Sequence, residues 1–226
     1  MELSITIVII IITVLVSIGA FNNQKIMEDL IFYPPAISKR NQWYRFFSCG
    51  LIHADWAHLL FNMYALYIFG AGQRKDGVEY IFKMVFNDKG GMLYLVMYIA
   101  ALAVCLLPTY AKNKDNYHYR SLGASGAVSA VVFAYMLFDP MRGMGLFFLP
   151  IFIPGFLFGI LYLVISSWLE KRGGGNINHS AHIWGSVFGI LFVIAACKLF
   201  SDYPVLQEFI EQVKNTDPSQ LIRYGR

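Results

Sequence analysis

Residues 121–138 read SLGASGAVSAVVFAYMLF and contain no Asp, Glu, Lys or Arg. A charge at mid-bilayer costs roughly 2.5–3.5 kcal/mol on insertion scales, so a run of about 18 residues without one predicts a helix that crosses a membrane. Five more runs of this kind occur, at residues 3–21, 56–73, 92–110, 146–169 and 177–197. The sequence therefore predicts an all-α membrane protein, a bundle of six transmembrane helices.

The composition excludes several classes of protein. Of the 226 residues, 57% are hydrophobic and 14% are charged, whereas a typical soluble domain carries about 25% charged residues. A disordered or a soluble acidic protein is thereby excluded. The net charge of +4 is small and no basic cluster alternates with exposed aromatics, so we expect no nucleic-acid partner. Cys49, Cys105 and Cys197 are an odd number of scattered thiols, which predicts packing residues rather than disulfides or a zinc site.

The segments around the spans complete the predicted organisation. Six helices of about 20 residues fit one membrane domain, residues 1–200, followed by a C-terminal surface tail, residues 201–226, with one short helix. Residues 22–55 are too apolar for a solvated linker and predict a membrane-associated first loop, anchored by Arg45. Pro150 and Pro154 predict a kinked, less tightly held fifth helix.

The ends of the chain predict how it sits in the membrane. No Lys or Arg precedes the first span, so we expect that span to remain as a helix rather than to be cleaved as a signal peptide. Lys and Arg are evenly divided between the two sides of the membrane until the long first loop is discounted. The remaining count favours a cytoplasmic N-terminus, and we expect an integral multi-pass protein of the plasma or inner membrane.

Polar side chains gather at the beginnings of the second, fourth and sixth spans. The second span carries His58 and Asn62, the fourth Ser125, and the sixth His182. Because these three helices run in the same direction, their N-terminal ends lie on one side of the membrane. Polar side chains inside a membrane usually mark a site. We therefore expect these four side chains to meet at one shallow depth.

The residue types that converge favour acyl transfer. Serine and histidine supply a nucleophile and a general base. His58 and Asn62, spaced i and i+4, share one helix face and could donate hydrogen bonds to an oxyanion, where each donor is worth about 2.7–4 kcal/mol. The N-terminus of the helix that carries Ser125 favours the same negative charge. The glycines that flank this serine, Gly123 and Gly126, permit close approach of other backbone.

Other chemistries fit the sequence less well. The predicted spans contain no Asp or Glu, which argues against an aspartyl protease and against a transporter with a carboxylate relay. His179 and His182 lack the glutamate of an HExxH zinc motif. The segment around Ser125 lacks the second glycine of a G-x-S-x-G elbow. We accordingly expect no metal and no cofactor.

Four motifs in order make the chain similar to the rhomboid intramembrane serine proteases, from about Tyr44 to Gly189. They are an aromatic-Arg pair, a His and Asn four residues apart, G-x-S-G and A-H-x-x-G. Here they are Tyr44-Arg45, His58 with Asn62, Gly123-Ala124-Ser125-Gly126, and Ala181-His182 with Gly185.

The resemblance implies a role for each matching residue. Ser125 would be the nucleophile and His182 its base, with His58, Asn62 and the main-chain N–H of Ser125 holding the oxyanion. Gly123, Ala124, Gly126, Ser129 and Gly185 would shape the site. In several family members an aromatic residue four positions after the serine stacks on the histidine, but this chain has Ser129 there. Ser129 could instead bond the imidazole or a water. The fifth helix would gate lateral access, and the substrates would be transmembrane helices of other proteins within the lipid bilayer.

Close approach of the fourth and sixth helices is predicted by two small-xxx-small patterns. These are Ser125 with Ser129, and Gly185 with Gly189.

Plainer interpretations remain open beside these. Ser125 alone could be a helix-packing residue, and His58 with Asn62 an interhelical hydrogen bond without catalytic role. We expect His53 to brace the loop or line a water pocket, and His118 and His179 to be loop or interface residues. Ser121 is a candidate helix N-cap. The alternative function is a non-catalytic rhomboid-like protein that binds transmembrane helices.

Overall fold

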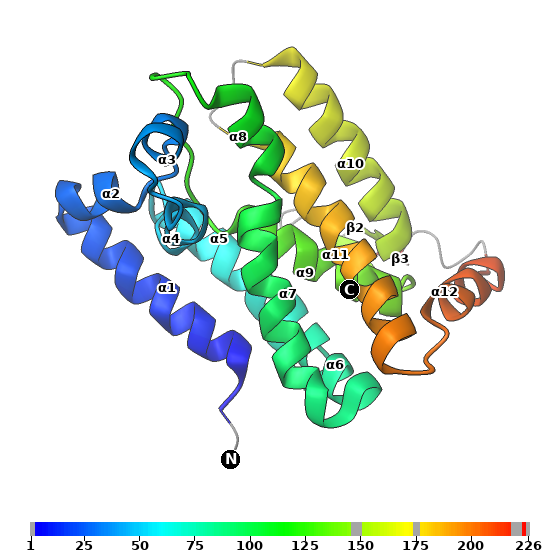
Figure 1. The fold of residues 1–226 in the computed structure, drawn as a ribbon. Coiled ribbons are helices and arrows are strands. Elements are labelled where there is room, and N and C mark those ends of the chain that lie inside the picture. The colour runs from blue at the N-terminus through cyan, green and yellow to red at the C-terminus, as the bar shows by residue number, and fades with distance from the viewer. Residues whose placement is uncertain (1–2, 146–150, 174–176, 218–222, 225–226) are drawn as a thin grey trace.

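The computed structural model describes residues 3–145, 151–173, 177–217 and 223–224, and these are mostly helical (Figure 1). The principal helices are α1 (Ile5–Asn22), α2 (Gln24–Leu30), α3 (Pro34–Arg40), α4 (Arg45–Ser48), α5 (Trp56–Leu66), α6 (Val78–Phe86), α7 (Gly90–Val104), α8 (Leu107–Asn113), α9 (Ser125–Phe138), α10 (Gly155–Arg172), α11 (His179–Phe200) and α12 (Val205–Lys214). The strands are β1 (Gly143–Gly145), β2 (Ile151–Pro154) and β3 (Arg223–Tyr224).

Three stretches of helix are long and apolar enough to cross a membrane by length and composition: Ile5–Asn22, Val78–Asn113 and His179–Phe200. Helix α9 is apolar but shorter. Large apolar side chains lie exposed on the outer faces of α1, α10 and α11, among them Leu15 at 64%, Val164 at 60% and Leu191 at 60%. Such faces suit lipid rather than water, as in an integral membrane protein.

Helix α9 forms the centre of the bundle, where α5, α7, α10 and α11 all contact it (Figure 1). Every residue from Gly126 to Val131 is buried, because most of these side chains are small and let neighbouring helices come close. A Cβ added at Gly185 would collide with the carbonyl oxygen of Gly126, and one at Gly189 with that of Ala130. The backbones of α9 and α11 are therefore in direct contact.

The residues of α9 that meet α11 differ by one position from the predicted pattern. The glycines on α11 are those of the predicted pattern, but they face Gly126 and Ala130. Ser125 and Ser129 lie one residue earlier on the helix and remain available for polar contacts. This offset turns the serine hydroxyls away from the backbone contact.

The first loop folds into the short helices α2, α3 and α4. Arg45 is buried and donates from Nη1 to the carbonyl oxygens of Glu28 (2.8 Å) and Ile31 (2.7 Å), at the end of α2. A helix end leaves such carbonyls without partners, and the guanidinium satisfies them. The predicted anchoring role of Arg45 is thus confirmed.

Phe32 of this loop pairs with Ser121 through two backbone hydrogen bonds of 3.0 and 3.1 Å. The suggestion that Ser121 caps a helix was therefore wrong, since its backbone is extended and α9 begins four residues later. The pairing ties the first loop to the segment that leads into α9.

The fifth predicted span begins too early. Residues 151–154 form strand β2, which pairs antiparallel with β1 and β3, and α10 starts only at Gly155. Pro154 has no backbone N–H and disfavours helical geometry at the residue before it, which explains the late start. The remaining predicted residues, 146–150, lie outside the described part. The fold is therefore not purely helical, because it includes this small sheet.

Two smaller predictions are confirmed. The tail forms the short helix α12, whose Gln212 donates to the carbonyl oxygen of Phe138 on α9 (3.4 Å). Cys49, Cys105 and Cys197 are buried free thiols, as expected for packing residues.

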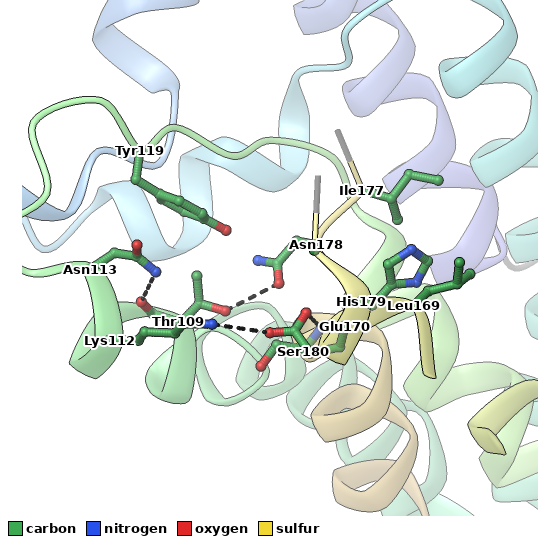
Figure 2. A pocket seen from close by; sticks show the side chains of 11 residues that line it. Thr109, Lys112, Asn113, Tyr119, Leu169, Glu170, Ile177, Asn178, His179 and Ser180 are labelled. Atoms are coloured by element: carbon green, nitrogen blue, oxygen red, sulfur yellow. Dashed lines mark hydrogen bonds and ion pairs between the residues drawn. The ribbon is translucent and has the colours of Figure 1, made fainter. Parts of the chain in front are cut away.

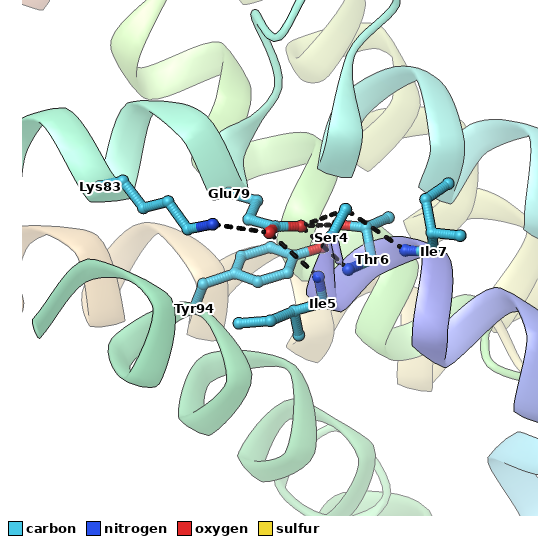
Figure 3. A network of polar contacts seen from close by, with 7 residues as sticks. All are labelled: Ser4, Ile5, Thr6, Ile7, Glu79, Lys83 and Tyr94. Carbon is cyan, nitrogen blue, oxygen red and sulfur yellow. Dashed lines mark hydrogen bonds and ion pairs between the residues drawn. The ribbon is translucent and has the colours of Figure 1, made fainter. Parts of the chain in front are cut away.

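Glu79, near the start of α6, holds the N-terminus of α1 (Figure 3). Its carboxylate accepts hydrogen bonds from the Ser4 hydroxyl (2.7 Å), the Ile5 amide (3.0 Å), and the amide and hydroxyl of Thr6 (both 2.9 Å). Nζ of Lys83, one turn later on α6, lies 3.2 Å from Oε1 of the same carboxylate. A carboxylate is well suited to this place because the first amides of a helix have no partners within the helix.

Glu79→Gln is expected to lower the free energy of unfolding by about 3 kcal/mol, because it leaves buried donors facing an amide N–H₂ and removes the charge. The midpoint of thermal unfolding in detergent measures the effect. Glu211→Gln, on an exposed position of α12, is the control and should leave the midpoint unchanged. Equal midpoints for the two variants would contradict this account of Glu79.

Candidate active site

Helices α5, α9 and α11 begin at one end of the bundle, and local contacts fix each start. Asp55 caps α5 by accepting from the amide of His58 (2.8 Å), and Asn178 caps α11 by accepting from the amide of Ala181 (3.0 Å). Short polar side chains at such positions satisfy otherwise unpaired amides. Helix α9 has no side-chain cap of its own. Its first turn is fixed by a neighbouring histidine instead, as described below.

Ser125 and His182 lie side by side across the contact between α9 and α11. The Oγ atom of Ser125 is 2.7 Å from Nε2 of His182, a short hydrogen bond. The serine is the first residue of α9 and the histidine lies in the first turn of α11. The two backbones touch where Gly126, the residue after the serine, meets Gly185, about one turn beyond the histidine, so the separation is fixed by main-chain packing.

His58 lies against the glycine that precedes this serine by two residues. Gly123 has a φ of 108°, which L side chains rarely adopt, and a Cβ there would lie 2.7 Å from Cε1 and 2.9 Å from Nε2 of His58. The imidazole therefore fills the space that a side chain at position 123 would need. Asn62, one turn later on α5, is buried and donates from Nδ2 to the carbonyl oxygen of His58 (2.8 Å).

His53, which is fully buried, connects α1 to the start of α9. The amide of Ala124 donates to its Nε2 (3.4 Å), so Nδ1 carries the proton and faces the Oγ of Ser17 (3.0 Å). The Ser17 hydroxyl in turn donates to the carbonyl oxygen of Leu51 (2.9 Å). Burial, and then the nearby His58, lowers the pKa of His53 to about 3, so the ring stays neutral and keeps this tautomer at neutral pH. His53 thus braces the loop, one of the two roles expected of it.

Ser129 bonds a tyrosine on α10 rather than the imidazole. Its Oγ lies 3.0 Å from the phenol oxygen of Tyr162 on α10. The Tyr162 ring stacks on the His182 ring, with centroids 6.2 Å apart and planes 17° apart. The sequence analysis missed Tyr162, although it is the one tyrosine in the predicted fifth span and its hydroxyl needs a partner there.

A separate hollow of 290 Å³ lies between α8 and the adjoining ends of α10 and α11 (Figure 2). Glu170 at the end of α10 accepts from the amide of Ser180 (3.1 Å) and lies 3.6 Å from Nζ of Lys112 on α8. Thr109 donates to Asn178 (3.2 Å) across the same hollow. These contacts join the last turn of α10 to the first turn of α11, close to the residues described above.

The two remaining histidines, His179 and His118, lie outside the contact between Ser125 and His182. His179 lines this hollow, and its ring lies edge-on to His182 with centroids 5.9 Å apart. His118 is exposed in the loop between α8 and α9. Among the described residues, no group of three or more His, Cys, Asp or Glu could hold a metal ion.

A hydroxyl in short contact with an imidazole at a helix N-terminus can perform acyl transfer. The imidazole can take the proton of the hydroxyl as the oxygen attacks a carbonyl. The positive end of the α9 dipole and the free amides of its first turn favour the negative charge that forms on the carbonyl oxygen.

Comparisons with known proteins point to one family. A family model described as "Rhomboid domain" matches residues 40–199. The chain is 28% identical over 170 residues to RHOMBOID-like protein 12, mitochondrial, of Arabidopsis thaliana, covering 74% of this chain and 50% of that protein. It is 26% identical over 171 residues to the rhomboid protease GlpG of Haemophilus influenzae, covering 75% and 78% of the two chains. A third relative, Rhomboid-like protein 11, chloroplastic, of Arabidopsis thaliana, is 29% identical over 162 residues, 67% of this chain and 51% of that one. The chain thus spans about half the length of the two plant relatives.

Proposed function

This chain belongs to the rhomboid family, and we propose that it is an active intramembrane serine endopeptidase. The observation that carries the proposal is the 2.7 Å contact between the Ser125 hydroxyl and Nε2 of His182. A nucleophile and a base within hydrogen-bond reach are the minimum requirement for covalent acyl transfer. The relative named as a protease, GlpG, is matched over most of its length.

In the proposed reaction, Ser125 Oγ attacks the carbonyl carbon of a peptide bond while its proton passes to Nε2 of His182. The tetrahedral intermediate collapses, the C–N bond breaks, and the imidazolium returns its proton to the leaving amine. Water then attacks the acyl-serine ester with His182 again as base, which releases the second product and restores the serine.

The oxyanion would be held by the main-chain N–H of Ser125, by the His58 imidazole and by the Asn62 amide. One N–H of the Asn62 amide is bonded to the His58 carbonyl, so the second N–H is the one proposed to face substrate. Gly123 lets the His58 imidazole lie directly against the backbone that leads into Ser125, because a Cβ at position 123 would collide with the ring.

We propose that the substrates are transmembrane helices of other membrane proteins. Three helical stretches are long and apolar enough to cross a membrane, and α5, α9 and α10 would complete a six-helix membrane domain. We propose a cytoplasmic N-terminus and a plasma or inner membrane location for it. The start of α9 lies near the end of the bundle, so cleavage would occur near one end of the substrate helix.

The test is serine-directed labelling of the purified protein in detergent, together with cleavage of a model transmembrane substrate. Wild type is expected to react with a fluorophosphonate probe at one site and to cleave the substrate, whereas Ser125→Ala should do neither. Binding of the substrate without labelling or cleavage by wild type would instead identify a non-catalytic protein that binds transmembrane helices. Labelling that persists in Ser125→Ala would place the reactive serine elsewhere.

A further inference from the structure

The inner face of α10 is a stripe of small residues with one aromatic side chain in it. Gly155, Gly159 and Ser166 are buried along this face. At Gly159 a Cβ would lie 3.0 Å from the sulfur of Met136 and 3.3 Å from the Phe133 ring, so α10 packs closely on α9 there. Neighbouring residues such as Leu161 (51% exposed) point outward. Tyr162, less than one turn beyond Gly159, therefore projects from α10 into the bundle.

Tyr162 makes three contacts inside the bundle, and each restricts it. Its hydroxyl lies 3.0 Å from Ser129 Oγ. Its ring meets the Phe133 ring, with centroids 5.7 Å apart, and stacks on His182 with planes 17° apart. A phenol held at its tip by a hydrogen bond and along its side by a second ring has little freedom to rotate. The face it presents to the imidazole is thus fixed in place.

The imidazole needs such support because no carboxylate partner for the His182 ring is seen in the described part of the chain. The rings of Tyr162 and His179 lie against it. Without a hydrogen-bonded acid, an imidazole can turn about its Cβ–Cγ bond and carry Nε2 away from the serine. A stacked ring with centroids in the usual range of aromatic pairs opposes that rotation.

We propose that Tyr162 is a positioning residue that holds the His182 imidazole in line with Ser125, an assignment that rests on the proposed function. Ser129 serves this arrangement because its short side chain leaves room for the phenol and supplies the partner of its hydroxyl. The support for the base thus comes from α10 rather than from the helix that carries the nucleophile. Any outward movement of α10 would separate the Tyr162 ring from the His182 ring.

The experiment compares Tyr162→Leu, Tyr162→Phe and Ser129→Ala with wild type, measuring kcat and KM on a model transmembrane substrate and the rate of fluorophosphonate labelling. Tyr162→Leu is expected to lower kcat and the labelling rate by roughly 10- to 100-fold with little change in KM, because misplacement of a reacting group by about 1 Å has effects of that order. Tyr162→Phe keeps the ring and should recover most of the rate lost in Tyr162→Leu. Ser129→Ala removes the same hydrogen bond and should lower the rate by the same small factor as Tyr162→Phe.

The matched control is Leu161→Ala, an adjacent outward-facing change on the same helix that should leave both rates unchanged. Midpoints of thermal unfolding and the final extent of labelling report the folded fraction, to which the rates are normalised. Tyr162→Met, with its flexible side chain, replaces Tyr162→Leu if that variant does not fold.

Two outcomes would overturn the assignment while leaving the proposed function intact. One is an active wild type with a Tyr162→Leu rate within twofold of it. The other is an equal loss in Tyr162→Phe and Tyr162→Leu, which would make the hydroxyl rather than the ring the important group. A wild type that neither labels nor cleaves would overturn the proposed function, and this assignment with it.

Discussion

Ser125→Ala and His182→Ala are each expected to lower kcat on the order of 10⁴-fold, and the double variant no further. The hydroxyl and the imidazole lie 2.7 Å apart and act on one proton in the proposed reaction, so either change alone removes the whole unit. The residual rate would come from the proposed oxyanion donors and from substrate binding, which neither change removes.

The measurement is single-turnover cleavage of a transmembrane substrate by the four proteins, with KM determined separately. His118→Ala, which alters an exposed loop histidine, is the control for loss of an imidazole and should behave as wild type. Losses that multiply in the double variant would show that the two side chains act independently, against the proposed mechanism. An active His182→Ala would require another base.

Gly185→Ala is expected to reduce cleavage at least 100-fold and to lower the midpoint of thermal unfolding. An added methyl group would lie 2.8 Å from the carbonyl carbon of Gly126 and closer still to its oxygen, and neither is a flexible side chain that could move aside. The two helices would have to separate. Overpacking of this kind destabilises by roughly 1–3 kcal/mol, and a displacement of about 1 Å at a reacting group is worth about 10²-fold in rate.

Leu191→Ala is the control for a change on the outer face of the same helix, where the side chain is 60% exposed. Cleavage rates and unfolding midpoints are compared in the same detergent. A fully active Gly185→Ala would mean that α9 and α11 can separate without affecting the Ser125–His182 pair, contrary to the packing described here.

The sequence predicts the parts of this site that depend on a single helix or on the order of helices. Runs without charge located α1, α9 and α11, and the family resemblance is borne out by the family model over residues 40–199. Spacing also placed Ser125 and His182 in the first turns of their helices, and the structure brings these two together. The helix positions and the pairing of Ser125 with His182 use only local composition and direction along the chain, whereas the resemblance uses the order of four motifs.

Contacts between distant segments could not be predicted in this way. Tyr162 reaches His182 from a helix whose start the sequence placed too early, and no local pattern indicates which way its ring points. The same holds for Glu79, whose partners on α1 are more than 70 residues away. His53 likewise connects three segments through hydrogen bonds that depend on tertiary packing. Such polar contacts are fixed only when the helices have packed.

The main-chain contact between α9 and α11 limits how this protein can diverge. No side chain separates Gly126 from Gly185, so no substitution can widen or narrow that gap by a small increment. We therefore expect substitutions that adjust the contact between Ser125 and His182 to occur on α10, the third helix around this pair. Close homologues that differ in turnover would then differ in sequence at position 162 and its neighbours on α10, while Gly126 and Gly185 stay the same.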